Sequence, residues 1–156
     1  MSVTVVRHAH AVSRRHWEGD DAWRVLSPKG EAQAGLLVAP LLAGRPTRIV
    51  SSPYLRCVAT VELLAVAAGL VVEPDGRLAE GNDRPAVDLV RSLQDSGECA
   101  VVCSHGDVIP HLLVVLANED GVDLGPDPRV EKGSVWILEG DRGRFTSARH
   151  IPPPVP

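Results

Sequence analysis

The sequence lacks long apolar runs and paired cysteine motifs. Its longest apolar runs, residues 36–43 and 112–117, fall far short of the roughly 20 residues that a membrane span needs. The chain does not open on a basic segment followed by an apolar stretch. Cys57, Cys99 and Cys103 have no CxxC spacing, which favours buried, reduced thiols. We therefore expect a cytoplasmic protein with no membrane partner.

An excess of positive charge is also missing. The formal net charge is −4, whereas a protein that binds nucleic acid or an anionic membrane needs a basic face. Lysine is scarce, with only Lys29 and Lys132 among 16 basic residues. Any anion site must therefore be a local cluster built mainly of arginine, whose planar fork binds two oxygens at once. No GxxxxGK[ST] stretch is present, so the site is not a P-loop.

The pattern of apolar segments predicts an α/β fold. We expect a three-layer structure with a mostly parallel central sheet flanked by helices and an antiparallel hairpin late in the chain. At 156 residues the chain has the length of one domain. The expected strands are 3–6, 47–51, 70–73, 98–103, 134–139 and 144–149, and the expected helices begin near residues 28, 53, 85 and 107.

Local signals refine these elements. Strand 98–103 is the most continuously apolar and should lie in the middle of the sheet. Ser27-Pro28 and Ser52-Pro53 each combine an N-cap residue with a proline at the first helical position. Pro40 should kink the first helix or end it early. The polar loop at 11–26 contains two tryptophans, which suggests that it packs against something.

Basic side chains follow three of the expected strands. Arg7 and His8 come after the first strand, Arg56 lies in the helix after the second, and His105 follows the fourth. Right-handed crossovers bring the carboxyl ends of parallel strands to one edge of the sheet, so these groups should meet there. Such a cluster repels itself unless an anion lies within it, and a phosphoryl group matches the arginine fork.

The motifs also resemble a known family. They are Arg7-His8 after an opening strand, Leu26-Ser27-x-x-Gly30-x-x-Gln33-Ala34, Ser51-Ser52-Pro53-x-x-Arg56 with Thr60, Leu78-x-Glu80, and Ser104-His105-Gly106. In this order they resemble the histidine phosphatase superfamily, which has the phosphoglycerate mutase-like fold. The short length resembles its compact branch of bacterial phosphohistidine phosphatases and actinobacterial Nudix-associated phosphatase domains. No Nudix segment is present, and residues 1–156 are expected to form a single histidine phosphatase domain.

The resemblance implies a role for each matching residue. His8 would be the nucleophile that forms a phosphohistidine intermediate, and Arg7, Arg56 and His105 would hold the phosphoryl oxygens. Glu80 would protonate the leaving oxygen and later accept a proton from water. The implied reaction is hydrolysis of a phosphomonoester or a protein phosphohistidine, with a phosphorylated small molecule or a phosphoprotein as partner. No metal or other cofactor is implied.

Some positions depart from the family pattern. Ala9 replaces the usual glycine, and Ala59 replaces the glutamine before Thr60. His10 stands where an acidic residue or glutamine is common, and it could bind phosphate or point away. Asp107 is an alternative proton donor to Glu80, but its position also suits a helix cap.

Two other functions fit the same residues. The first is a divalent-metal-dependent hydrolase that uses His8, His10, His105 and Asp107 as ligands, although Arg7 and Arg56 would then lie beside a cation. The second is a non-catalytic module that binds a phosphorylated ligand. Substrate specificity would come from the loops at 11–25, 81–84 and 118–132. The sequence does not indicate the oligomeric state.

Overall fold

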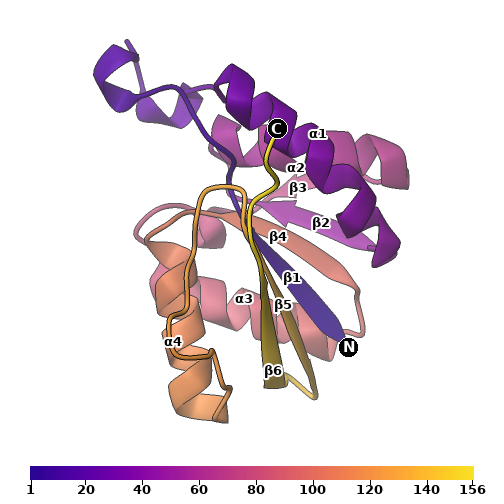
Figure 1. Ribbon diagram of the computed structural model, residues 1–156. Helices are drawn as coiled ribbons and strands as arrows, with labels where there is room; N and C mark the ends of the chain where they lie inside the picture. Colours follow the sequence, from indigo (N-terminus) through magenta and orange to yellow (C-terminus); the bar gives the residue numbers. More distant parts are fainter.

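A six-stranded sheet lies at the centre of the protein, with the strand order β3-β2-β4-β1-β5-β6 (Figure 1). The computed structural model describes residues 1–156. The strands are β1 (Ser2–Arg7), β2 (Arg48–Ser51), β3 (Val72–Pro74), β4 (Ala100–Ser104), β5 (Val135–Asp141) and β6 (Arg144–Ile151). Strands β1 to β4 are parallel, β5 pairs antiparallel with β1, and β6 pairs antiparallel with β5. The predicted mostly parallel sheet with a late hairpin is confirmed.

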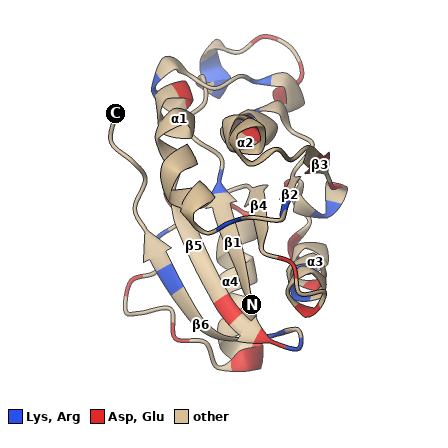
Figure 2. Cartoon of the chain, turned by 90° about the vertical axis from the view of Figure 1, so that its right-hand side faces the viewer, with Lys and Arg blue, Asp and Glu red and all other residues tan.

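Helices cover both faces of this sheet, as Figures 1 and 2 show. They are α1 (Pro28–Ala43), α2 (Leu55–Ala68), α3 (Asp83–Asp95) and α4 (Val108–Asp120), with three short 3-10 helices, η1 (Arg14–His16), η2 (Asp21–Trp23) and η3 (Gly76–Leu78). Neighbouring strand residues point to opposite faces, so Val5 packs with α3 and α4 while Val6 packs with α1 and α2. The structure is therefore three-layered, as predicted.

Strand β4 lies between β2 and β1, as its apolar sequence predicts, and all five of its residues are buried. The third strand begins two residues later than predicted, at Val72, because its parallel pairing with β2 runs from Ile49–Val72 to Ser51–Pro74. Pro74 is tolerated there because β3 is at the edge of the sheet.

Pro40 does not end α1 early, which was one of the two outcomes that the sequence predicted, and the helix continues to Ala43. A proline at this position leaves the carbonyl of Leu36 without its helical donor. Both Leu36 and Pro40 are exposed, so water can hydrogen-bond that carbonyl. The proline is therefore tolerated on the solvent side of the helix.

The loop between β1 and α1 is tied at its base by a bridge between Ala11 and Leu26. The expectation that both tryptophans pack down is wrong for Trp23, which is 64% exposed at the end of η2. The next residue, Arg24, is buried instead and bonds the carbonyl of Val12 at 2.8 Å. Its long side chain therefore fills the inner side of the loop.

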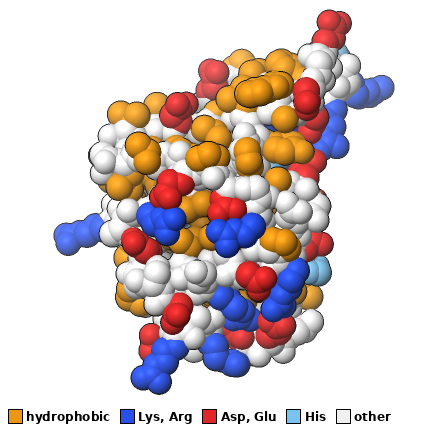
Figure 3. Space-filling model, turned by 180° about the vertical axis from the view of Figure 1, so that it is seen from behind, with side chains coloured by type: hydrophobic (Ala, Val, Ile, Leu, Met, Phe, Trp, Pro, Cys, Tyr) orange, Lys and Arg blue, Asp and Glu red, His pale blue; other side chains and the backbone are white.

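The two helix layers differ in surface character. Side chains of α3 and α4 are joined by ion pairs, Arg84 with Glu119 at 3.0 Å and Arg91 with Asp120 at 2.7 Å. Apolar side chains gather instead over the half of the molecule that holds α1 and α2, where Leu63 is half exposed (Figure 3). No helix in the structure has the length and apolar character needed to cross a membrane.

Candidate active site

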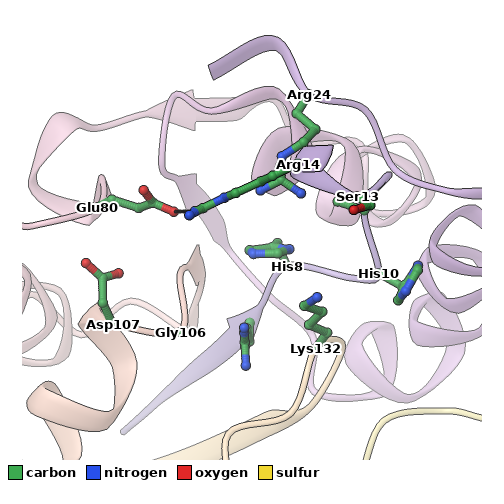
Figure 4. Close-up of a pocket in the computed structure, with 11 residues that line it drawn as sticks. His8, His10, Ser13, Arg14, Arg24, Glu80, Gly106, Asp107 and Lys132 are labelled. Atoms are coloured by element: carbon green, nitrogen blue, oxygen red, sulfur yellow. Dashed lines mark hydrogen bonds and ion pairs between the residues drawn. The ribbon is translucent and has the colours of Figure 1, made fainter. Parts of the chain in front are cut away.

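A cavity of about 690 Å³ opens at the carboxyl edge of the parallel strands (Figure 4). Its basic lining residues are Arg7, His8, His10, Arg14, Arg24 and Lys132, and its acidic ones are Glu80 and Asp107. Positive charge therefore predominates in this cavity although the chain as a whole has a net charge of −4. The cavity has the electrostatic character of an anion site.

His8 follows β1 directly and is only 5% exposed. Its Nδ1 lies 2.8 Å from the carbonyl oxygen of Ala9, so the proton is on Nδ1 and Nε2 keeps its lone pair. Burial lowers the pKa of His8 to about 3, and the charges of Arg56, His105 and Arg7 add to this effect. His8 is therefore a neutral imidazole at pH 7, as a nucleophile requires.

This low pKa predicts a pH-dependent contribution to stability. Between pH 6.5 and about 3, the unfolded chain binds a proton at His8 that the folded protein excludes. The free energy of unfolding should therefore decrease as the pH is lowered through this window, by about 2 kcal/mol between pH 7 and pH 5. Urea unfolding of the wild type and His8→Asn at both pH values measures the difference. Equal losses in the two proteins would contradict the low pKa.

Arg7 precedes His8 at the end of β1, and its side chain is held by the backbone of another segment. Its Nη1 donates to the carbonyl of Val130 at 2.7 Å, while its Nε is buried without a partner. Gly106 allows the guanidinium to lie here, because a Cβ on this residue would be 2.5 Å from Arg7 Cζ. The glycine of the Ser-His-Gly motif therefore makes space for an arginine from another strand.

Arg56 and His105 lie behind the cavity wall and are almost fully buried, at 0% and 1% exposed. Arg56 Nη2 donates to Glu80 at 2.6 Å and to Asp21 at 3.2 Å. The ring of His105 packs edge-on against that of His8, with centroids 5.6 Å apart. The structure thus brings all four predicted basic groups together, but it exposes only Arg7 and His8 to the cavity.

Ser52 contacts His105, which the sequence did not suggest. We predicted this serine as the N-cap of the second helix, but α2 begins at Leu55 with Tyr54 as its N-cap. The Ser52 hydroxyl lies 2.8 Å from His105 Nε2. Cys57 Sγ lies 3.5 Å from the same nitrogen. The serine therefore helps to orient the histidine instead of capping the helix.

Glu80 connects several of these groups through one oxygen. Its Oε1 accepts from Arg56 at 2.6 Å and from Arg14 at 3.1 Å, and it lies 3.6 Å from His105 Nδ1. The carboxylate thus lies against the arginine and the histidine that the sequence assigns to phosphoryl oxygens. Its other oxygen has no hydrogen-bond partner in the structure.

Asp107 faces the cavity from the start of α4. It occupies the N-cap position of the helix, as the sequence suggested, but its side chain makes no capping hydrogen bond. Its Oδ2 instead accepts from the backbone N–H of Gly81 at 2.8 Å. Asp107 therefore fixes the loop that contains Glu80.

Comparison with known proteins agrees with this arrangement. The model of the histidine phosphatase superfamily (branch 1) matches residues 3–82, about half of the chain. The chain belongs to the histidine phosphatase superfamily. The resemblance seen in the sequence motifs is therefore confirmed at the level of the family.

One curated relative is the 8-oxo-(d)GTP phosphatase of Mycolicibacterium smegmatis strain ATCC 700084 / mc(2)155. It is 33% identical over 159 aligned positions, which cover 98% of this chain and 48% of the relative. The chain therefore spans about half the length of that protein.

Solved structures of the superfamily share the fold. The protein histidine phosphatase SixA complexed with tungstate has a TM-score of 0.74 at 22% identity, covering 94% of this chain and 93% of that chain. The mycobacterial glucosyl-3-phosphoglycerate phosphatase has a TM-score of 0.68 at 20% identity, covering 96% of both chains. At these identities the similarity concerns the fold.

His10, the residue that departs from the superfamily pattern, lies at the rim of the cavity. Its Nδ1 is 2.6 Å from the hydroxyl of Ser27, and its backbone N–H donates to Gln33 at 3.0 Å. Gly30 lets α1 approach this segment, because a Cβ there would lie 1.8 Å from the carbonyl oxygen of His10. These contacts give Ser27, Gly30 and Gln33 at the start of α1 a structural role beside His10.

The alternative metal site does not form. It requires His8, His10, His105 and Asp107 to converge, but the structure contains no group of three or more His, Cys, Asp or Glu side chains that could hold a metal ion. His10 turns towards α1, and Asp107 turns towards Gly81. The rings of His8 and His105 pack together, but separate contacts hold His10 and Asp107, so the four side chains form no metal-binding group.

Three basic residues of the cavity were not selected from the sequence. Arg14 and Arg24 come from the loop after β1, and Lys132 comes from the segment before β5. All three belong to loops that we expected to form the rim. The sequence showed that Lys132 and several arginines occur in these loops. The spacing of residues along the chain could not show that they lie near His8.

Proposed function

We propose that this protein is a metal-independent phosphatase that acts through a phosphohistidine intermediate on His8. The observation that supports this most strongly is the buried, neutral imidazole of His8 at the wall of a cationic cavity. A group that only binds phosphate would gain more from a positive charge than from a lone pair. The family to which the chain belongs supports the same reaction class.

In the first step, the phosphoryl group lies among Arg7, Arg56 and His105. To reach Arg56 it displaces Glu80, whose Oε1 lies within reach of both that arginine and His105. The lone pair of His8 Nε2 forms the N–P bond while the bond between phosphorus and the leaving oxygen breaks. The leaving oxygen keeps the electron pair and takes a proton from a carboxylic acid at the site, which we assign to Glu80. Charge on the equatorial oxygens is stabilised by guanidinium groups that are already in place.

In the second step, water attacks the phosphohistidine. The N–P bond breaks, its electron pair returns to Nε2, and inorganic phosphate leaves. A carboxylate at the site accepts the proton of the attacking water, and we assign this role to Glu80 because its second oxygen is free. Asp107 is the alternative because it also faces the cavity.

The roles of Glu80 and Asp107 can be distinguished by how the activity of each variant depends on the leaving group of the substrate. An alkoxide needs a proton as it leaves, whereas p-nitrophenolate does not, so loss of the general acid affects alkyl phosphates more. We expect Glu80→Gln to lower kcat/KM by about 100-fold for an alkyl phosphate and by less than about tenfold for p-nitrophenyl phosphate. Asp107→Asn is the matched control, since its amide oxygen can still accept from Gly81. The reverse pattern would assign the acid to Asp107.

Metal independence is tested by chelation. We expect turnover of p-nitrophenyl phosphate to be unchanged after the protein is dialysed against EDTA, because arginine and histidine supply the positive charge. Activity that disappears in EDTA and returns with a divalent cation would favour the metal-dependent alternative. Binding of phosphate without turnover in either condition would favour a non-catalytic module.

Several finer expectations accompany this proposal. The substrate is a phosphorylated small molecule or a phosphoprotein, and the names of similar proteins include a protein histidine phosphatase and a glucosyl-3-phosphoglycerate phosphatase. Residues 1–156 form one histidine phosphatase domain. We assign the protein to the cytoplasm, which the free thiols of Cys57, Cys99 and Cys103 support.

A further inference from the structure

The charged residues of the cavity are unevenly distributed around His8. Glu80 and Asp107 lie on one side of its ring, while Ser13, His10 and Lys132 lie on the other (Figure 4). The proposed phosphoryl ligands Arg7, Arg56 and His105 are sufficient to hold one PO3 group. Positive charge therefore remains on the side of the cavity away from the carboxylates.

Lys132 is placed on this side by a rigid segment. Its neighbour Gly133 donates its backbone N–H to the carbonyls of both Arg7 and His8, each at 3.1 Å. The same segment accepts from the side chain of Arg7 at Val130 and from its backbone at Ser134. These bonds hold the backbone of the segment against Arg7 and His8, so the main chain at Lys132 is fixed relative to the proposed nucleophile.

The ammonium group of Lys132 has no partner in the protein. It forms no hydrogen bond and no ion pair, and the residue is exposed at the cavity that it lines. Burial lowers the pKa of Lys132, and the charges of Arg7, Arg24 and Arg14 lower it further. An unpaired ammonium beside these arginines is therefore available to bind an anion in the cavity.

Arg24 offers a second free donor group to the same cavity. Its Nε donates to Asp21 at 2.9 Å and its Nη1 to the carbonyl of Val12 at 2.8 Å, which fixes the guanidinium plane. Its Nη2 has no hydrogen-bond partner, and the residue lines the cavity although only 6% of it is exposed. The free edge of a fixed guanidinium is suited to bind an oxyanion.

We propose that Lys132 and Arg24 form a second anion subsite, and that the substrate has a second phosphate directly linked to the phosphoryl group that His8 removes. This inference rests on the proposed function and defines its substrate class as organic diphosphates, such as nucleoside diphosphates. His8 Nε2 attacks the terminal phosphorus, and the P–O bond of the anhydride breaks. The bridging oxygen leaves with the electron pair as part of a phosphate monoester, whose added negative charge Lys132 and Arg24 neutralise.

This substrate class also fits the position of Glu80. A phosphate leaving group is a weaker base than an alkoxide and can leave without a proton. A carboxylate that two arginines hold can then serve mainly to accept the proton of water in the second step. The acid requirement of an alkyl phosphate would not apply to the diphosphate.

The subsite is tested by binding, without turnover. Isothermal titration calorimetry in EDTA would compare inorganic phosphate with methylenediphosphonate, a diphosphate analogue that cannot be hydrolysed. We expect wild type to bind the diphosphonate at least about tenfold more tightly than phosphate, and Lys132→Met to lose most of this preference. Lys29→Met is the matched control, because it removes the only other lysine, which is exposed on the first turn of α1.

The outcomes separate the subsite from the proposed function. Equal affinity for the two ligands, or a preference that Lys132→Met and Lys29→Met reduce to the same extent, would overturn the subsite. A preference that depends on Lys132 supports the subsite even if the protein turns over neither p-nitrophenyl phosphate nor ADP, which would instead refute the phosphatase. Turnover of p-nitrophenyl phosphate together with equal affinities would support the phosphatase and exclude the second subsite.

Discussion

Replacement of His8 by alanine is expected to reduce phosphatase activity by about 10⁴-fold or more, because it removes the proposed nucleophile. The side chain is buried and neutral, and its Nδ1 is fixed by the carbonyl of Ala9. The measurement is kcat/KM for p-nitrophenyl phosphate in EDTA. Rapid quench of the wild type into alkali, followed by mass spectrometry, should also show a phosphoryl group on a peptide that contains His8.

His16→Ala is the matched control for this experiment. His16 lies in η1, is exposed and does not line the cavity, so its loss should leave kcat/KM within about twofold of wild type. Full activity in His8→Ala would exclude the proposed nucleophile. Loss of activity with a phosphoryl group still trapped on another residue would assign the nucleophile elsewhere.

Replacement of Arg56 by lysine is expected to lower kcat/KM by about 10² to 10³-fold, the range observed when one transition-state donor is removed. Lysine keeps the positive charge that pairs with Glu80 and Asp21, but it cannot present two parallel donors to a phosphoryl group. Methionine would remove one charged partner from each of these carboxylates and would also destabilise the fold, although Arg14 still pairs with Glu80 and Arg24 with Asp21. Lysine therefore tests the phosphate-binding role more selectively.

Arg48→Lys provides the control for Arg56→Lys. Arg48 also forms a paired arginine–glutamate contact, with Nε and Nη2 at 3.0 and 2.9 Å from the two oxygens of Glu73. It lies at the start of β2, whereas the cavity lies at the carboxyl edge of the sheet. We expect kcat/KM close to wild type in Arg48→Lys. Similar losses in both variants would show that the effect of Arg56→Lys comes from stability, which urea unfolding of the two proteins would measure.

The contacts of Glu80 could not be predicted from the local sequence pattern. The motif predicts a carboxylate near the site, but the atoms that it contacts come from Arg14 in the loop after β1, Arg56 in α2 and His105 after β4. Each distance depends on how three separate crossovers pack. The same reason explains why the sequence assigned Ser52 to a helix cap, since its contact with His105 spans 53 residues.

The sequence by itself determined the order of strands and helices, the parallel sheet and the presence of Arg7, His8, Arg56 and His105 at one edge of it. Those features follow from local apolar patterns and from the rule that parallel strands end together. Only the tertiary structure decided which basic groups face the cavity and that Lys132 lies beside His8. That placement depends on the antiparallel pairing of β5 with β1, which brings Val130 within 2.7 Å of an arginine 123 residues earlier. Long-range pairing of this kind is determined by packing of the whole chain, so no spacing between neighbouring residues predicts it.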